Sequence, residues 1–234
     1  MALAIVLAAG KGSRMKSEVA KQYIELKGKE VLYYSLKRFQ DNDNIDAIIL
    51  VTRDEDIEYC QNEIVNKYGF TKVIKICTGG KERYNSVYEG LKNIKEIIGY
   101  NKDIVMIHDG ARPFVTDDMI NDSIKAAMEF GACTVAMPVK DTIKIVDENK
   151  FGLETPDRRF LYQVQTPQTF KFDVLFEAYN EMLKEENYNI TDDTMLVEQY
   201  KGVRSKMVEG AYENIKITTP DDIEIAEKLI EKIF

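Results

Sequence analysis

The sequence has a single histidine, His108, and only three cysteines among its 234 residues. One histidine excludes a zinc site built from several histidines, and a Ser-His-Asp triad would have to use His108. The cysteines are Cys60, Cys77 and Cys133, an odd number, far apart and without the spacing of metal ligands. We therefore expect buried, reduced thiols in a cytoplasmic protein.

Long apolar runs and an excess of positive charge are also missing. No stretch of about 18 apolar residues is present, so we expect no transmembrane helix. The opening apolar run is short and has no basic residues before it, which is unlike a signal peptide. The net charge of −8 disfavours a general nucleic-acid binder but is compatible with a local basic pocket for a small anion. We expect neither a membrane nor a nucleic acid as a partner.

What the sequence does contain is a regular alternation of apolar strand and helix patterns. Buried strands are expected at residues 2–9, 46–52, 72–77, 103–108 and 132–137, and helices at 30–40, 55–68, 83–98, 116–131 and 172–186. Thr116 is suited to cap the fourth of these helices and Gly131 to end it. The order predicts a Rossmann-like, doubly wound α/β fold with a mostly parallel sheet. Since no repeat or linker interrupts it, we expect one domain over residues 1–234.

The alternation breaks between residues 140 and 165. Residues 141–146 and 160–165 are extended stretches, and the polar segment 147–159 joins them. This pattern does not fit another strand–helix–strand unit. We expect a protruding β-arm here, and the alternative is a long ordered loop.

The first strand runs into a glycine loop with cations. Ala8 and Ala9 are followed by Gly10, Gly12 and Arg14, and Lys21 lies in a second basic segment. Closely spaced glycines at the carboxyl end of a strand let a phosphate chain approach the backbone without meeting a Cβ. No Walker A motif fits, and Met15 replaces the third glycine of a dinucleotide fingerprint, which disfavours a dehydrogenase. The loop indicates a nucleoside triphosphate site; the alternative is an ordinary tight strand-to-helix turn.

His108 and Asp109 end a buried strand at the sheet edge where open α/β folds bind ligands. Asp109 beside a triphosphate is suited to hold Mg²⁺, which takes one or two carboxylates together with phosphate oxygens. The alternative is that Asp109 pairs with Arg112. The side chain of His108 is expected on the other face of the sheet. We expect His108 to have a structural role or to orient a ligand.

A second glycine-rich turn covers residues 78–87. Its small residues would let a flat base lie against the backbone near Gly80. Ser86 is placed to hydrogen-bond that base, or alternatively to bond the backbone of its own helix. Arg83 is expected to be a positioning cation.

Two further cations are candidates for binding anionic groups of the substrates. Lys216 lies in an expected short strand at residues 214–220, and Arg158 lies near the arm. Taken singly, each of them would more often be an ordinary surface charge. Lys216 and Arg158 are singled out only because they belong to a set of motifs that follow one order along the whole chain.

Eight short motifs stand in one order over nearly the full length. They are Ala8-Ala9-Gly10-x-Gly12-x-Arg14-Met15, Lys21-Gln22-Tyr23, Gly79-Gly80-x-x-Arg83-x-x-Ser86-Val87, His108-Asp109-x-Ala111-Arg112-Pro113, Asp141-Thr142-Ile143-Lys144, Gln165-Thr166-Pro167-Gln168-x-Phe170, Thr191-Asp192-Asp193 and Asn214-Ile215-Lys216-Ile217-Thr218. Together they resemble the 2-C-methyl-D-erythritol 4-phosphate cytidylyltransferase family, which consists of glycosyltransferase-A-like nucleotidyltransferases.

The resemblance implies transfer of CMP from CTP to methylerythritol phosphate in non-mevalonate isoprenoid synthesis, with release of pyrophosphate and with Mg²⁺ as cofactor. It implies that Arg14, Lys21 and Lys216 are catalytic, and that Ala8, Ala9, Gly10, Gly12, Gly80, Ser86 and Asp109 bind CTP, Asp109 also holding the metal. Asp141, Thr142, Arg158, Thr166 and Thr191 fall where the family binds the sugar phosphate. The arm resembles a hairpin exchanged between subunits, which implies a homodimer in which Arg158 acts in the partner's site.

The sequence departs from the family pattern at two places. Ala20 stands where the family usually has proline, so we expect a more mobile loop around Lys21. Gly110 replaces a commoner alanine, a change expected to be harmless.

Two rival functions remain. A ribitol-5-phosphate cytidylyltransferase shares the fold, but such enzymes usually carry Ala-Gly-Gly in the first loop and Val before the Arg-Pro pair, where this chain has Ala8-Ala9-Gly10 and Ala111-Arg112-Pro113. A non-catalytic nucleotide sensor would bind CTP without turnover.

Overall fold

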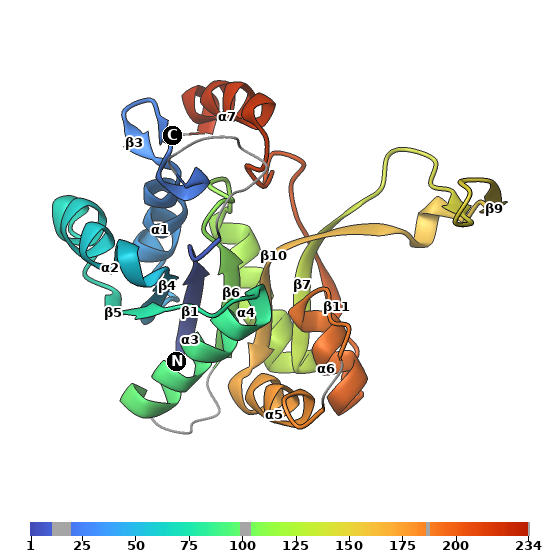
Figure 1. Cartoon of the computed structure of the whole chain (residues 1–234), viewed down its shortest axis with the longest axis horizontal. Coiled ribbons are helices and arrows are strands. Elements are labelled where there is room, and N and C mark those ends of the chain that lie inside the picture. The colour runs from blue at the N-terminus through green and yellow to red at the C-terminus, as the bar shows by residue number, and fades with distance from the viewer. Residues whose placement is uncertain (11–19, 99–103, 186–187, 234) are drawn as a thin grey trace.

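The computed structural model describes residues 1–10, 20–98, 104–185 and 188–233. Its centre is a seven-stranded sheet with the strand order β11-β7-β10-β6-β1-β4-β5 (Figure 1). The strands are β1 (Ala2–Leu7), β4 (Ala47–Thr52), β5 (Val73–Thr78), β6 (Ile104–Asp109), β7 (Ala132–Pro138), β10 (Tyr162–Lys171) and β11 (Lys206–Glu209). Only β10 runs antiparallel to its neighbours, β6 and β7. The predicted α/β fold with a mostly parallel sheet is confirmed.

Helices cover both faces of the sheet, because alternate residues of the central strands point to opposite sides. Ala2, Ala4 and Val6 of β1 belong to one core, with α1 (Val31–Asp41), α4 (Asp117–Phe130) and α7 (Pro220–Ile233). Leu3 and Ile5 belong to the other, with α3 (Arg83–Ile98), α5 (Phe172–Met182) and α6 (Asp193–Lys201). Within the described residues, every helix is too short or too polar to cross a bilayer.

Helix α4 begins and ends where its local sequence predicts. The hydroxyl of Thr116 accepts the backbone N–H of Met119 at 3.3 Å, and Gly131 ends the helix in the left-handed conformation with φ of +88°.

The helix expected at residues 55–68 is helical throughout but irregular. A 3-10 turn at Asp54–Asp56 leads into α2 (Ile57–Tyr59) and then into a wider π-helix, Cys60–Asn66.

The strand predicted at residues 214–220 is wrong. Residues 214–218 belong to no strand or helix; they pass the turn that follows β6, where the Ile217 N–H donates to the Ala111 carbonyl at 2.9 Å. The edge of the sheet is formed instead by β11, which pairs with β7.

The structure also contains a small hairpin that was not predicted from the sequence, β2 (Glu25–Leu26) with β3 (Lys29–Glu30). All three cysteines are buried and free of disulfides, as expected.

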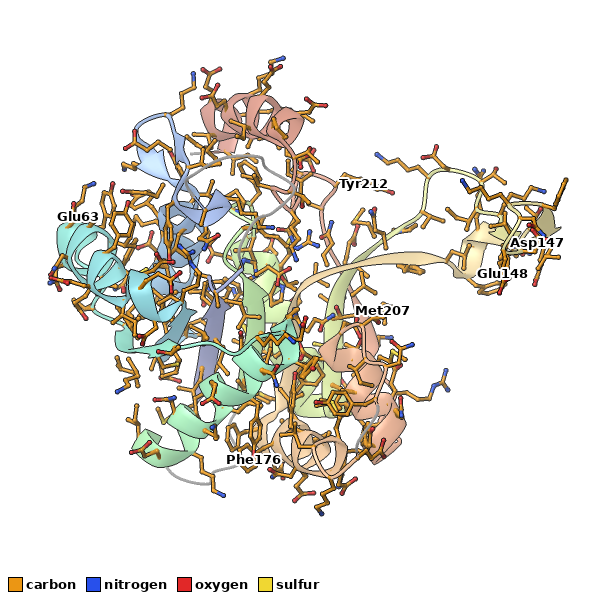
Figure 2. The ribbon with its side chains drawn as sticks, viewed as in Figure 1. Glu63, Asp147, Glu148, Phe176, Met207 and Tyr212 are labelled. Carbon is orange, nitrogen blue, oxygen red and sulfur yellow. The ribbon has the colours of Figure 1, made fainter. Side chains whose placement is uncertain are left out.

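Between β7 and β10 the chain leaves the sheet and extends outward (Figure 1). The segment carries a two-stranded hairpin of β8 (Ile145–Val146) and β9 (Gly152–Glu154), at the position where the sequence predicts the β-arm. Figure 2 shows Asp147 and Glu148 at the outer end, far from the sheet. Phe151 and Phe160 on this arm are 72% and 79% exposed, so its apolar side chains are not covered by the rest of the chain.

Candidate active site

A pocket of about 510 Å³ opens at the carboxyl ends of β1, β4, β5 and β6. From β1 the chain continues to β4 and β5 on one side of the sheet and then crosses to β6 on the other. Doubly wound sheets open a crevice at such a reversal. The lining comes from the turns after the four strands, from the segment with Lys21 and Gln22, from the first turns of α3, and from Lys216. Its residues are Leu7–Gly10, Lys21, Gln22, Arg53–Glu55, Thr78–Arg83, Ser86, Asp109, Ala111 and Lys216.

The first turn of the pocket offers bare backbone. A Cβ placed on Gly10 would have no atom of the described residues within 4 Å. The side-chain amide of Gln22 donates to the carbonyls of Ala8 at 2.6 Å and Gly10 at 3.3 Å, which ties this turn to the segment carrying Lys21. Gly12 and Arg14, also predicted here, lie outside the described residues.

The second glycine turn packs directly against the first. A Cβ on Gly79 would lie 2.6 Å from Oγ of Ser86 and 2.7 Å from Cβ of Ala9, so the two turns can approach only because residue 79 is glycine. Oγ of Ser86 accepts the N–H of Gly80 at 3.1 Å and donates to the carbonyl of Glu82 at 3.3 Å. The hydroxyl thus bonds the backbone of its own turn, one of the two expectations for it.

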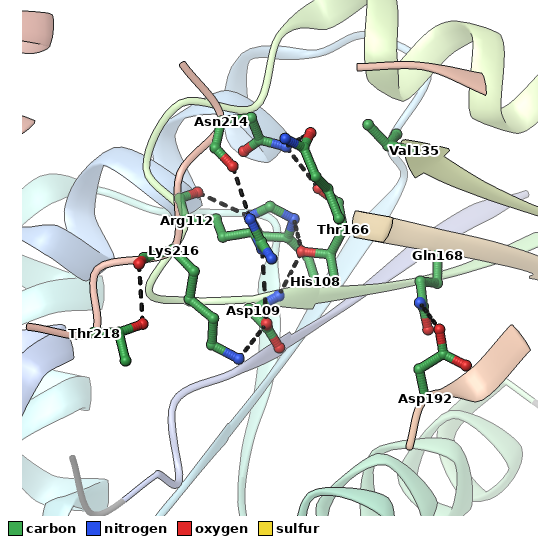
Figure 3. Close-up of polar contacts among 12 residues, drawn as sticks. His108, Asp109, Arg112, Val135, Thr166, Gln168, Asp192, Asn214, Lys216 and Thr218 are labelled. Atoms are coloured by element: carbon green, nitrogen blue, oxygen red, sulfur yellow. Dashed lines mark hydrogen bonds and ion pairs between the residues drawn. The ribbon is translucent and has the colours of Figure 1, made fainter. Parts of the chain in front are cut away.

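Asp109 lies in the pocket wall among three cations. Nζ of Lys216 is 2.7 Å from Oδ2, and Nε of Arg112 is 3.8 Å from Oδ2 (Figure 3). Nε of Arg83 is 3.5 Å from Oδ1. Burial opposes ionisation, but the charges of Lys216, Arg83 and Arg112 outweigh it and hold the pKa of this carboxyl well below its usual range. Asp109 is therefore an anion at neutral pH, and its pairing with Arg112 is the longest of the three contacts.

His108 and Thr166 are buried behind Asp109 (Figure 3). Oγ1 of Thr166 accepts the N–H of Asp109 at 3.1 Å and lies 3.1 Å from Nδ1 of His108, whose Nε2 lies 3.0 Å from the Arg112 carbonyl. A carbonyl only accepts, so Nε2 carries the proton and Nδ1 accepts from the Thr166 hydroxyl. Burial lowers the pKa of His108 to about 4. The neutral imidazole therefore holds the turn that carries Asp109 and Arg112.

Lys216 is brought to the pocket by a segment that Asn214 anchors. The Asn214 amide donates to Oε1 of Gln165 at 3.1 Å and to the carbonyl of Thr166 at 3.0 Å. Nη1 of Arg112 donates to the Asn214 carbonyl at 2.8 Å (Figure 3). The position of Lys216 thus depends on side-chain contacts rather than on a strand.

A second carboxylate, Asp193, lies behind Arg83. Nη1 of Arg83 is 2.7 Å from its Oδ2, and the Tyr179 hydroxyl donates to its Oδ1 at 2.5 Å. Burial and the neighbouring Asp193 raise the pKa of Tyr179, which therefore stays protonated and acts as a donor. Neither Asp193 nor Tyr179 was predicted from the sequence to be a functional residue.

The residues predicted for the sugar phosphate do not join this pocket within one chain. Asp141, Thr142 and Arg158 lie exposed on the arm, and Nη1 of Arg158 donates to the Lys140 carbonyl at 3.3 Å. Thr191 is exposed before α6, whereas Thr166 is buried and uses its hydroxyl for His108 and Asp109. Within one chain, the pocket is thus lined by described residues that were predicted to bind CTP or to be catalytic, and not by those predicted for the sugar phosphate.

Comparison with known proteins identifies the family. The family model for 2-C-methyl-D-erythritol 4-phosphate cytidylyltransferase matches residues 2–232. The chain belongs to this family. A cytidylyltransferase of that name from Lachnospira eligens is 49% identical over 227 residues, which is 97% of each chain. Another, from Clostridium botulinum strain Eklund 17B, is 49% identical over 232 residues, 99% of this chain and 100% of that one.

Solved structures of cytidylyltransferases agree with the fold. The crystal structure of the 4-diphosphocytidyl-2C-methyl-D-erythritol synthase of Anaerococcus prevotii has a TM-score of 0.83 at 35% identity, covering 98% of this chain and 96% of that one. The cytidylyltransferase of Francisella tularensis gives a TM-score of 0.77 at 32% identity, covering 97% and 98%. The family resemblance predicted from the eight motifs is confirmed, and the chain is a CTP-using nucleotidyltransferase.

Proposed function

We propose that this cytidylyltransferase binds CTP in the pocket at the strand ends and transfers its CMP group to 2-C-methyl-D-erythritol 4-phosphate. The observation that carries the proposal is the contact between Lys216 and Asp109, 2.7 Å long, in the wall of a pocket bounded by two glycine turns. Membership of the family supports both substrates. The chain acts as one domain, residues 1–234, with its arm at about 140–165. Its buried, free cysteines fit a reducing cytoplasm.

The reaction needs alignment and charge neutralisation rather than a covalent enzyme intermediate. A phosphate oxygen of methylerythritol phosphate bonds to the α-phosphorus of CTP as the bond to pyrophosphate breaks. The catalytic cations Arg14, Lys21 and Lys216 offset the negative charge that builds up on the α-phosphate and the leaving group. The remaining contacts to CTP come from the backbone of Ala8, Ala9, Gly10 and Gly12 for the phosphates and from Gly80 and Ser86 for cytosine.

Asp109 fits the role of a magnesium ligand. Oδ2 of its carboxylate faces Lys216, and among the described residues Oδ1 has only the longer contact to Arg83. Among the described residues no group of three or more His, Cys, Asp or Glu side chains could hold a metal by itself. A site with one carboxylate suits Mg²⁺ that arrives with triphosphate oxygens, and the ion would add positive charge beside the leaving group.

The arm supports a homodimer in which one chain completes the site of another. Its exposed apolar side chains form a surface that an isolated chain would leave in water: Ile143, Ile145, Val146, Phe151, Leu153 and Phe160. Contact between arms would cover this surface. It would also bring Asp141, Thr142 and Arg158 to the partner's pocket, where Thr166 and Thr191 complete the sugar-phosphate side.

Pyrophosphate release with CTP and Mg²⁺ tests the proposed function. Methylerythritol phosphate and ribitol 5-phosphate are compared as second substrates, and we expect kcat/KM to be at least about 100-fold higher for the first. A preference for ribitol 5-phosphate would contradict the assigned substrate. CTP binding without release from either substrate would favour a nucleotide sensor.

A further inference from the structure

Arg83 lies between two carboxylates that reach it from different elements. Asp109 comes from the end of β6 and Asp193 from the first turn of α6. Nη1 of Arg83 is 2.7 Å from Asp193, whereas Nε is 3.5 Å from Asp109. The shorter contact is thus with the carboxylate that does not line the pocket.

Asp193 is buried in the core, and its carboxylate faces Arg83. Its side chain is 1% exposed, Tyr179 donates to its Oδ1, and its backbone N–H donates to Oε1 of Gln168 at 3.0 Å. The cap of α6 is made by Asp192, whose carboxylate accepts the N–H of Met195 at 2.8 Å. A buried carboxylate is costly unless a cation faces it, and in the described part of the chain Arg83 is the cation within ion-pair distance.

We propose that Asp193 is a positioning residue that holds Arg83 away from Oδ1 of Asp109 and so keeps that oxygen available to metal-bound CTP. The inference rests on the proposed role of Asp109 as metal ligand. A guanidinium can grip both oxygens of a carboxylate with its fork of N–H donors. Lys216 already faces Oδ2, so an Arg83 released from Asp193 would close on Asp109 and occupy the remaining oxygen.

Binding of Mn²⁺–CTP to the full chain, measured calorimetrically without the second substrate, tests this without turnover. Asp193→Asn removes the charge with little change in volume, and we expect the dissociation constant to rise about tenfold. In an Arg83→Gln background the same substitution should change binding by less than about twofold, because the cation it restrains is absent. An equal loss in both backgrounds, or no loss in either, would overturn the proposal.

Two further variants keep the result interpretable if Asp193→Asn fails to fold. Tyr179→Phe removes one hydrogen bond from Asp193 without removing its charge, and we expect about threefold weaker binding of Mn²⁺–CTP. Unchanged binding by Tyr179→Phe would count against the proposal.

Asp117→Asn is the matched control. Asp117 also lies in the first turn of a helix, but that helix is α4, and there its carboxylate accepts a hydrogen bond from the side-chain amide of Asn42. We expect it to bind like the wild type, and a loss of binding there equal to that of Asp193→Asn would overturn the inference.

Asp109→Asn separates the two proposals. We expect it to abolish the gain in CTP affinity that Mn²⁺ provides. If Asp109→Asn leaves that gain intact, the assigned role of Asp109 fails and the inference fails with it. If Asp109→Asn removes the gain but Asp193→Asn does not weaken binding, only the inference about Asp193 fails.

Discussion

At the residue scale, Lys216 is the side chain whose removal should cost most among the described cations. It makes the shortest contact with Asp109, and its side chain is 36% exposed, so it contributes to charge in the pocket rather than to the core. We expect Lys216→Ala to lower kcat about 100- to 1,000-fold, which is the usual effect when an enzyme loses one preorganised group that stabilises charge in the transition state. Steady-state kinetics measure the loss, and circular dichroism checks that the fold is intact.

Lys228→Ala is the control for this substitution, because Lys228 lies exposed on α7 and does not line the pocket. It should leave kcat unchanged. Turnover near that of the wild type in Lys216→Ala would remove Lys216 from the catalytic residues.

His108 should make stability depend on pH. Burial lowers its pKa from the ordinary 6.5 to about 4, so between these values the unfolded chain binds more protons than the folded one. Stability is therefore fully present above about pH 6.5 and is lost as the pH falls toward 4. We expect the urea midpoint to fall over this window, and to fall less steeply in His108→Gln. Equal slopes for the two proteins would show that His108 does not control this loss.

At the element scale, the short 3-10 helix Lys21–Tyr23 begins after Ala20, the position where the family usually has proline. Ala20 is buried, with φ of −63° and ψ of 138°. Its φ already has the value that a proline ring imposes, so the native backbone of residue 20 suits proline. The departure from the family pattern thus leaves the backbone of residue 20 in a proline-like conformation.

We expect Ala20→Pro to raise the free energy of unfolding by about 0.4–1 kcal/mol, because it restricts the unfolded chain. Urea unfolding measures the change, and kcat should stay within about twofold. A lower midpoint for the variant would mean that proline does not fit the backbone here.

Elements with strong local signals were predictable from the sequence. The central strands β1, β4 and β6 are buried on both faces and are continuous apolar runs, and α4 carries its own cap and terminating glycine. The predicted strand at 214–220 was wrong because a short apolar alternation does not say whether a partner strand is available. That segment is held instead by Asn214 and Ile217, whose contacts lie more than 40 residues away in sequence.

The same distinction applies to the site. Gly10, Ser86, Asp109 and Lys216 follow strands or lie in motifs that the sequence displays, and the structure brings all four to one pocket. Asp193 was missed because an acidic residue at the start of a helix looks like a cap or a dipole partner. Only the fold shows that its carboxylate is turned inward toward Arg83.

At the scale of the whole molecule, the described residues of one chain provide the pocket at the strand ends and an arm that does not reach it. The exposed apolar surface of the arm and the distance of Arg158 from the pocket are both explained if arms exchange between subunits. Each dimer would then have two sites, each made from the pocket of one chain and the arm of its partner.

Mixing two inactive variants tests this arrangement most directly. Lys216→Ala disables the pocket and Arg158→Ala disables the arm, so a mixed dimer keeps one intact site, formed by the pocket of the second variant and the arm of the first. After equal amounts are unfolded, mixed and refolded together, we predict recovery of about a quarter of wild-type activity, since about half of the dimers are mixed and each has one working site. Wild-type chains refolded in the same way provide the reference. No recovery in the mixture, with full recovery of the reference, would contradict a site shared between two chains.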